Sequence, residues 1–157
     1  MNLTGVMLCC QVVGSRMAEE GRGSIINVGS MYGMVSPNQA LYAYREKRDG
    51  KPFIKAVSYA ASKSGLVNLT KYLATYWAPK NVRVNLISFG GVKTGSFDKE
   101  FIDAFLQRVP LGRQANPGEY NGVIQFLASE ASSYMTGSNV VVDGVDTTGR
   151  SLAGDVG

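Results

Sequence analysis

A tyrosine and a lysine four positions apart are the side chains of this sequence best suited to proton transfer. They are Tyr59 and Lys63, and on a helix this spacing places both on one face. The pKa of a free tyrosine is about 10, and a nearby ammonium lowers it because it favours the phenolate. The pair therefore suits a group that gives a proton to a forming alkoxide or takes one from an alcohol. Alone the motif is weak, since such pairs arise by chance on helix surfaces.

Composition excludes several other kinds of catalysis. The chain has 157 residues and no histidine, which removes Ser-His-Asp and Cys-His machinery and histidine-based metal sites. The adjacent Cys9 and Cys10 are poorly placed to bridge to each other and cannot form a four-ligand zinc site. We interpret them as small buried residues in a reducing compartment, and we expect no metal.

Charge and hydropathy argue against nucleic acids and membranes as partners. The net charge of +4 is weakly basic, whereas nucleic-acid binding needs a concentrated patch. No apolar run reaches the roughly 18 residues of a membrane span. The apolar start lacks a basic leader, so we interpret it as a helix rather than a signal peptide and expect a cytoplasmic protein.

Helical and strand patterns alternate along the chain. Helices are expected over 3–20, 58–77, 99–108 and 116–128, strands over 24–28, 82–87 and 139–144, and a long loop over 31–57. Leu66, Leu69, Leu73 and Trp77 form one apolar stripe, which could face the sheet or another subunit. The order predicts an α/β fold, the C-terminal part of a doubly wound Rossmann-type parallel sheet with flanking helices. We expect one domain over 1–146 and a flexible tail over 147–157.

Two strand ends carry residues suited to a ligand. Ser30 follows the strand over 24–28, and Gly90 and Gly91 follow the strand over 82–87. In open α/β sheets ligands bind at the carboxyl ends of the strands. A serine there can hold a substrate oxygen, and glycines permit close approach to a flat ring.

Five segments in order resemble the short-chain dehydrogenase/reductase family, namely 2–6, 25–30, 59–66, 81–94 and 110–144. The resemblance implies an oxidoreductase that uses NAD or NADP to interconvert a carbonyl and an alcohol by hydride transfer. It also implies a homodimer or homotetramer built on the helices that begin near Leu3 and Tyr59. The partner would be a small carbonyl or alcohol substrate, anionic or sugar-derived.

The resemblance also implies roles for single residues. Tyr59 is the general acid/base, and Lys63 lowers its pKa and holds the nicotinamide ribose. Ser30 orients the substrate oxygen, and Asn2 helps hold a water that relays protons from Lys63. Cofactor contacts are implied for Tyr59, Lys63, Gly90, Gly91, Val92 and Thr94. The plain alternatives are a helix N-cap for Asn2, a turn serine for Ser30 and core packing for Val92.

The sequence departs from the family in four places. The family's Gly-rich turn, which cradles the cofactor pyrophosphate, is not in the sequence. We therefore expect a fragment, a truncated gene product or half of a split protein, with bare strand edges and poor cofactor binding. Phe89 stands where the family usually has Pro, and Val145 where Gly is common. The connection between Ser30 and Tyr59 is longer than in most members.

The longer connection is basic. It has five Lys or Arg residues against Glu46 and Asp49, a local excess of +3. One hypothesis is that Arg45, Arg48 and Lys51 hold an anionic or sugar-phosphate substrate; the alternative is a solvated charged loop.

Two other functions remain open. The first is a catalytically silent fragment that serves only in assembly or binding. The second is a sugar-nucleotide epimerase, which shares the Tyr and Lys pair but generally has a longer C-terminal substrate domain.

Overall fold

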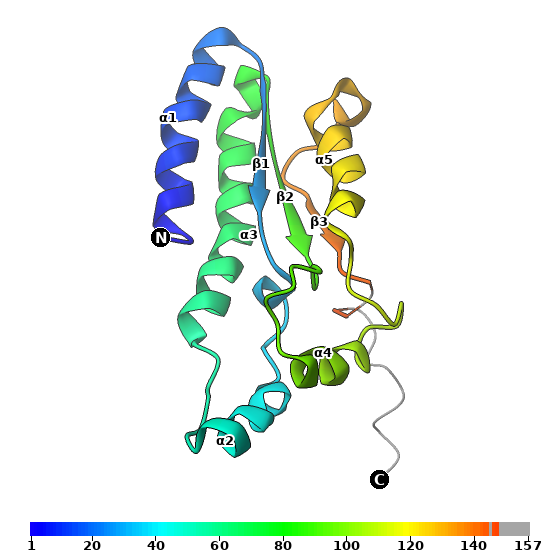
Figure 1. Cartoon of the computed structure of the whole chain (residues 1–157). Coiled ribbons are helices and arrows are strands. Elements are labelled where there is room, and N and C mark those ends of the chain that lie inside the picture. The colour runs from blue at the N-terminus through cyan, green and yellow to red at the C-terminus, as the bar shows by residue number, and fades with distance from the viewer. Residues whose placement is uncertain (145, 148–157) are drawn as a thin grey trace.

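The computed structural model describes residues 1–144, 146 and 147 (Figure 1). The helices are α1 (Thr4–Glu20), α2 (Ala43–Asp49), α3 (Val57–Trp77), α4 (Lys99–Leu106) and α5 (Asn121–Ala128). The strands are β1 (Gly23–Val28), β2 (Val82–Phe89) and β3 (Asn139–Val142), and short 3-10 turns η1 to η5 lie between these elements. The expected helices and strands are confirmed, with ends that differ by up to a few residues, and the last expected helix begins as a 3-10 turn.

The three described strands form a parallel sheet in the order β1-β2-β3. Helices α1 and α3 lie on one side of this sheet and α5 lies on the other (Figure 1). A parallel sheet covered on both faces confirms the predicted α/β class. Among the described strands β1 pairs only with β2, so its other edge has no strand partner within the described residues.

The core between α1, α3 and the sheet explains the apolar stripe. Leu73 and Trp77 of α3 pack with Val82 and Val84 of β2. The stripe therefore faces the sheet, and the question that the sequence left open is settled for these residues. Trp77 also lies over Gly14 of α1, where no side chain would fit.

The two cysteines differ in environment, which corrects the expectation that both are buried. Cys9 is exposed and Cys10 is buried. The Cys10 thiol donates to Asn27 Oδ1 at 3.3 Å, and Asn27 Nδ2 donates to Thr70 Oγ1 at 2.9 Å. Burial, and next the neighbouring Cys9, raise the pKa of Cys10. This chain of hydrogen bonds ties α1, β1 and α3 together, which gives Cys10 and Asn27 a structural role.

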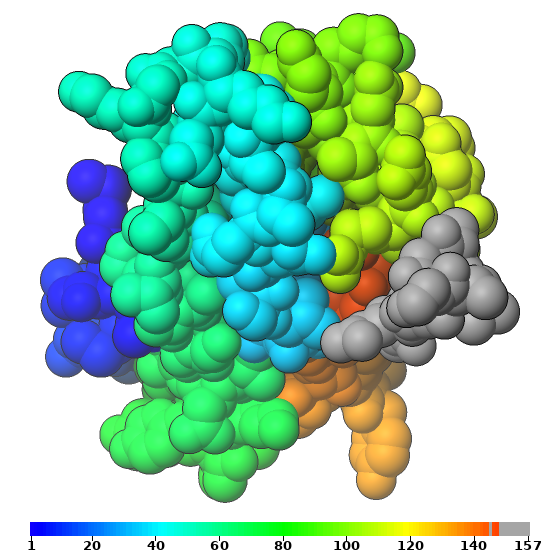
Figure 2. Space-filling model, turned by 90° about the horizontal axis from the view of Figure 1, so that it is seen from below, coloured from blue at the N-terminus to red at the C-terminus, as the bar shows by residue number. Residues whose placement is uncertain are grey.

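The expectation of a long loop over 31–57 is wrong. The segment contains η1 (Met31–Gly33), η2 (Gln39–Tyr42) and helix α2. Leu41 and Tyr42 are buried in a second core with Phe101 and Phe105 of α4. Figure 2 shows the segment and α4 side by side at the end of the molecule where the strands finish. The pattern missed these elements because each is only one or two turns long, too short for a clear period.

A capping box starts the last helical segment. η4 (Pro117–Tyr120) leads into α5, and Asn116 and Glu119 form a capping box. The Glu119 carboxylate accepts 2.6 and 2.7 Å bonds from Arg113 and a 2.8 Å bond from the Asn116 backbone. These bonds, those of Arg113 first, lower the pKa of Glu119 to about 2.

Replacing this carboxylate should give a pH-dependent loss of stability. The pKa of Glu119 is lower in the folded state than its ordinary 4.5, so its contribution is present above about pH 4.5 and is lost as the pH falls toward 2. We expect Glu119→Gln to lower the melting temperature at pH 7 and the difference from wild type to shrink below pH 4.5. Thermal unfolding across this pH range is the measurement. The exposed Glu130→Gln is the control, and an unchanged melting temperature for Glu119→Gln at pH 7 would refute the idea.

Two predictions from the sequence concern residues at the end of the chain. Val145 and residues 148–157 lie outside the described residues, so the substitution at Val145 and the tail expected over 147–157 are not described beyond Thr147. The boundary at residue 146 remains a prediction. Within the described residues no helix is long and apolar enough to cross a membrane.

Candidate active site

Ser30 lies at the carboxyl end of β1, where the backbone turns into η1. Its backbone is extended, and its hydroxyl oxygen accepts a 3.2 Å bond from the Tyr32 amide. The residue is 8% exposed. The serine therefore caps η1, in agreement with the plain alternative, and this use leaves its hydroxyl proton for another acceptor.

Two contacts fasten the Ser30 segment to α3. Lys63 Nζ donates to the Val28 carbonyl at 2.8 Å, and Ser64 Oγ donates to the Gly33 carbonyl at 3.0 Å. The backbones approach closely here, since a Cβ on Gly33 would lie 2.8 Å from the Lys63 carbonyl oxygen. Because Ser30 lies between the two tied points, the fold brings Ser30 and Lys63 to one place, with Tyr59 one turn earlier on α3.

Two ammonium groups flank the Tyr59 ring. Lys63 Nζ lies 5.9 Å from the ring centroid, and Lys55 Nζ lies 5.4 Å from it. Tyr59 and Lys63 are both partly buried, and burial lowers the pKa of Lys63. The Tyr59 ring is therefore close to two positive charges, one from a lysine before it in the sequence and one from a lysine after it. Sequence reasoning identified Lys63 and missed Lys55. Lys55 lies before the start of α3, so the helical spacing that relates Tyr59 to Lys63 does not apply to it.

Asn2 shares a hollow with Lys63. This hollow of about 620 Å³ lies along α1 and the open edge of β1, and Asn2, Val28 and Lys63 are among its lining residues. Leu3, not Asn2, occupies the N-cap position of α1, so the N-cap alternative for Asn2 is wrong. The exposed Asn2 amide thus faces a space that Lys63 also reaches.

Close packing within the chain explains the two glycines at the end of β2. A Cβ on Gly90 would lie 2.6 Å from Asp143 Cα, and one on Gly91 would lie 2.5 Å from the Phe105 ring. Internal packing is therefore enough to require both glycines, whereas their contact with a cofactor stays a prediction. Val92, partly buried, forms a bridge with Ala115.

The remaining residues of this strand end lie beside that bridge. Thr94 is exposed, and Phe89, in place of the usual Pro, packs its ring 4.2 Å from that of Tyr120. Val92 and Thr94 follow β2, which pairs in parallel with β1, and Ser30 follows β1, so both strand ends open on the same edge of the sheet.

The basic segment is partly neutralised. Asp98 receives Arg48 at 3.1 Å and Arg45 at 3.5 Å, and the Tyr44 hydroxyl donates to it at 2.5 Å. These contacts, the Tyr44 bond first, lower the pKa of Asp98. Arg45 also stacks on Phe53 at 4.4 Å. Both arginines named in the anion hypothesis therefore already have an anionic partner.

The lysines of the same segment, unlike these arginines, have no anionic partner among the described residues. Neither Lys51 nor Lys55 forms an ion pair within residues 1–144, 146 and 147. Lys55 is held from both sides, since its amide donates to Gln39 Oε1 at 2.9 Å and its ammonium lies 5.9 Å from the Tyr42 ring centroid. Lys55 is therefore a cation beside the Tyr59 ring that is available to an anion. The described residues contain no cluster suited to a metal ion.

Comparisons with known families cover most of the chain. A family profile described as "Enoyl-(Acyl carrier protein) reductase" matches residues 49–144, and one described as "short chain dehydrogenase" matches residues 1–44. D-threitol dehydrogenase of Mycolicibacterium smegmatis is 37% identical over 148 residues, which are 92% of this chain and 51% of that protein. The 3-oxoacyl-[acyl-carrier-protein] reductase of Thermotoga maritima is 36% identical over 92% of this chain and 53% of its own length.

Solved structures agree with the sequence relatives. A short chain dehydrogenase from Leptospira borgpetersenii with bound NAD+ superposes with a TM-score of 0.81 at 35% identity, covering 93% of this chain and 53% of that one. A gluconate 5-dehydrogenase from Burkholderia cenocepacia in complex with NADP and tartrate gives 0.79 at 31% identity, covering 94% and 54%. The chain thus spans about half the length of the relatives that it matches.

Proposed function

Because this chain belongs to the short-chain dehydrogenase/reductase family, we propose that it forms the catalytic part of an NAD(P)-dependent oxidoreductase that interconverts a carbonyl and an alcohol. The observation that carries the proposal is the fastening of the Ser30 segment to the helical turn of Tyr59 and Lys63. That fastening supports the proposal, because Ser30 lies between two points tied to α3, and a hydroxyl donor near a phenol and an ammonium is what proton transfer to a substrate oxygen needs.

The chain's own residues divide the proton chemistry. The Ser30 hydroxyl donates to the substrate oxygen and orients it, and the Tyr59 hydroxyl gives that oxygen a proton in reduction or removes one in oxidation. Lys63 keeps positive charge beside the Tyr59 ring while one of its three protons is held by the Val28 carbonyl. Asn2 and Lys63 face one hollow, which suits a water that returns the proton from solvent.

The residues present fit a nicotinamide cofactor at this end of the sheet. NAD or NADP supplies or accepts the hydride when bound. Lys63 has two further N–H donors for ribose hydroxyls, and Tyr59 lies one turn away on the same helix. Gly90 and Gly91 would keep the backbone free of side chains beside the ring, and Val92 and Thr94 would hold its carboxamide. Nothing in these residues selects between NAD and NADP.

Other properties of the whole protein follow as proposals. The substrate is a small carbonyl or alcohol, as the names of the threitol, gluconate and oxoacyl relatives suggest, and the protein acts in the cytoplasm. Helices α1 and α3 would form the interface of a homodimer or homotetramer. In support, α1 exposes Met7, Leu8 and Val12, and α3 exposes Tyr72 and Tyr76.

Fluorescence titration of the purified 157-residue chain with NADH and then NADPH tests the proposed function. Saturable binding by the chain, weakened by Lys63→Met, supports it. If the chain binds neither, the titration is repeated after mixing with the N-terminal half of the Thermotoga maritima reductase. Binding that appears only in the mixture also supports the proposal, whereas no binding in either case favours the catalytically silent alternative.

A further prediction concerns Lys55, which we propose in place of Arg45 and Arg48 as the residue that binds an anionic substrate group. If an anionic substrate group binds beside Tyr59, Lys55→Met should lower kcat/KM for a hydroxy acid about tenfold or more, because it removes a charged hydrogen-bond donor. The amide of the same acid should lose little. Steady-state kinetics on the gluconate and gluconamide pair makes the comparison, with Lys51→Met as the matched control. Equal losses for acid and amide would count against the anion hypothesis.

A further inference from the structure

A small cavity of about 170 Å³ lies at the carboxyl ends of β2 and β3, next to the connection between α4 and α5. The strand ends and the connection both contribute lining residues, and these include Gly91, Leu111, Ala115, Val142 and Gly144. Ser30, Tyr59 and Lys63 are not among the described residues that line it. The cavity is therefore not the place where the substrate oxygen of the proposed reaction binds.

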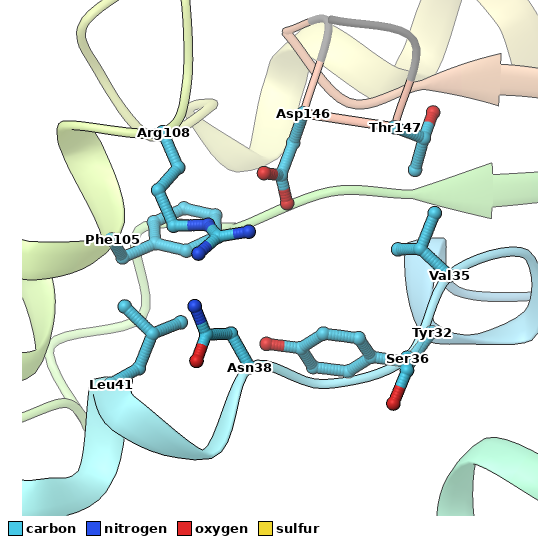
Figure 3. A pocket seen from close by; sticks show the side chains of 9 residues that line it. All are labelled: Tyr32, Val35, Ser36, Asn38, Leu41, Phe105, Arg108, Asp146 and Thr147. Carbon is cyan, nitrogen blue, oxygen red and sulfur yellow. The ribbon is translucent and has the colours of Figure 1, made fainter. Parts of the chain in front are cut away.

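A larger neighbouring cavity is a different space. Figure 3 shows its lining side chains, among which those of Tyr32, Arg108 and Asp146 are directed toward one another. The two cavities have only Phe105 in common among the described residues. Because the Tyr32 amide donates to the Ser30 hydroxyl oxygen, the larger cavity borders the Ser30 segment and belongs with the proposed active site.

The small cavity is lined by a tyrosine whose buried hydroxyl has no partner. Tyr120 is 5% exposed, and within residues 1–144, 146 and 147 its hydroxyl has no hydrogen-bond partner. The ring of Phe89, which stands where the family usually has Pro, packs against the Tyr120 ring and so positions it. Buried hydroxyls are nearly always hydrogen-bonded. The Tyr120 hydroxyl therefore indicates a polar partner inside the cavity.

The charges around the cavity constrain that partner. Burial, and next Glu119 and Asp143, raise the pKa of Tyr120, so its hydroxyl keeps the proton and can donate it. Arg113 is the one cation among the described lining residues, and its guanidinium is already bound by Glu119 at 2.6 and 2.7 Å. An anion would thus meet Asp143 without a free cation beside it, and the site favours an uncharged ligand that accepts a hydrogen bond.

The remaining wall sets the size and polarity of the ligand. Phe105 and Val109 are buried, and together with Leu111 and Val142 they make much of the wall apolar. In another protein a dry apolar cavity of about 150 Å³ holds benzene, so the volume of about 170 Å³ found here has room for one six-membered ring with one small substituent.

We propose that this cavity binds a small uncharged phenol, whose ring lies against the apolar wall and whose oxygen accepts a hydrogen bond from the Tyr120 hydroxyl. Binding here involves no hydride transfer, so the proposal does not depend on the proposed oxidoreductase activity. The site nevertheless adjoins the strand end at which the cofactor is expected, because the lining residue Ala115 forms a bridge with Val92.

Nuclear magnetic resonance titration of the 15N-labelled 157-residue chain tests the site. The probe is phenol, and the matched probe is toluene, in which a methyl group replaces the hydroxyl. Phenol should shift the amide signals of Leu111 and Gly144 in a saturable way. Tyr120→Phe should raise the Kd for phenol about five- to tenfold, because it removes one hydrogen bond, and should leave the Kd for toluene within a factor of two.

Two controls separate this role from a structural one. Tyr32→Phe removes another buried hydroxyl that lacks a partner, and it should leave the Kd for phenol unchanged. Without ligand, Tyr120→Phe should keep or raise the melting temperature, because it removes an unmatched polar group. A lower melting temperature would show that the chain itself satisfies this hydroxyl and would overturn the proposal. Absence of saturable shifts with phenol, as when water alone fills the cavity, or equal changes for phenol and toluene in Tyr120→Phe, would also overturn it.

Discussion

Tyr59→Phe is expected to lower turnover about 10²- to 10⁴-fold, the range that general acid/base groups contribute. The substitution removes only the hydroxyl that exchanges a proton with the substrate oxygen. The ring, partly buried near Lys55 and Lys63, stays in place. The free energy of unfolding should therefore change by no more than about 0.5 kcal/mol.

The measurement is the rate of NAD(P)H oxidation with a panel of carbonyl substrates, in the chain or in the mixture that binds cofactor. The control is Tyr134→Phe, because Tyr134 is fully exposed and is not one of the site residues, so this variant should keep the wild-type rate. Turnover of Tyr59→Phe within a factor of two of wild type would show that another group transfers the proton. A loss that accompanies unfolding would instead show a structural role for Tyr59.

Gly14→Ala is expected to destabilise the chain by about 2 kcal/mol or more, because it overpacks a filled core. A Cβ at this position would lie 2.7 Å from Cζ2 of Trp77 and closer still to two other carbons of the ring. Trp77 is 5% exposed and packed against Leu73, Val82 and Cys10, so moving the ring aside would disrupt these core contacts. The clash exceeds the gain of up to about 1 kcal/mol that alanine brings to a helix.

Gly122→Ala is the matched control for this prediction. Gly122 also lies in a helix, α5, but nothing is within 4 Å of a Cβ built there. The same substitution should therefore stabilise the chain by about 0.4–1 kcal/mol. Denaturant unfolding of both variants gives the two values. Equal effects at both positions would mean that α1 and α3 do not pack as closely as the structure places them.

Short, strongly patterned elements were predictable because their signals are local. The β-branched run that ends at Val28 predicts β1, and the Asn116 and Glu119 pair predicts a helix start that the structure shows as a capping box. The spacing of Tyr59 and Lys63 predicts one face of a helix, and α3 supplies it. In each case the physical cause lies within a few residues of the signal.

Features that depend on partners far along the chain were not predictable in this way. The arginines of the basic segment looked free, but Asp98, which neutralises them, lies far along the chain, beyond α3 and β2. The segment itself looked like a loop, and it becomes ordered because Leu41 and Tyr42 are buried against α4. Gly90 and Gly91 suggested a ligand, yet their close neighbours are Asp143 and Phe105.

By itself the sequence determined the class of the fold, the order of its elements and the residues suited to proton transfer, since periodicity and motif spacing are properties of adjacent residues. Only the tertiary structure decided that Lys63 reaches the Val28 carbonyl, that Lys55 stands beside Tyr59, and that the α3 stripe faces the sheet. It also decided that Tyr32, Arg108 and Asp146 meet in one cavity. These contacts arise when burial of apolar surface brings distant segments together, and no local pattern encodes which side chains then meet.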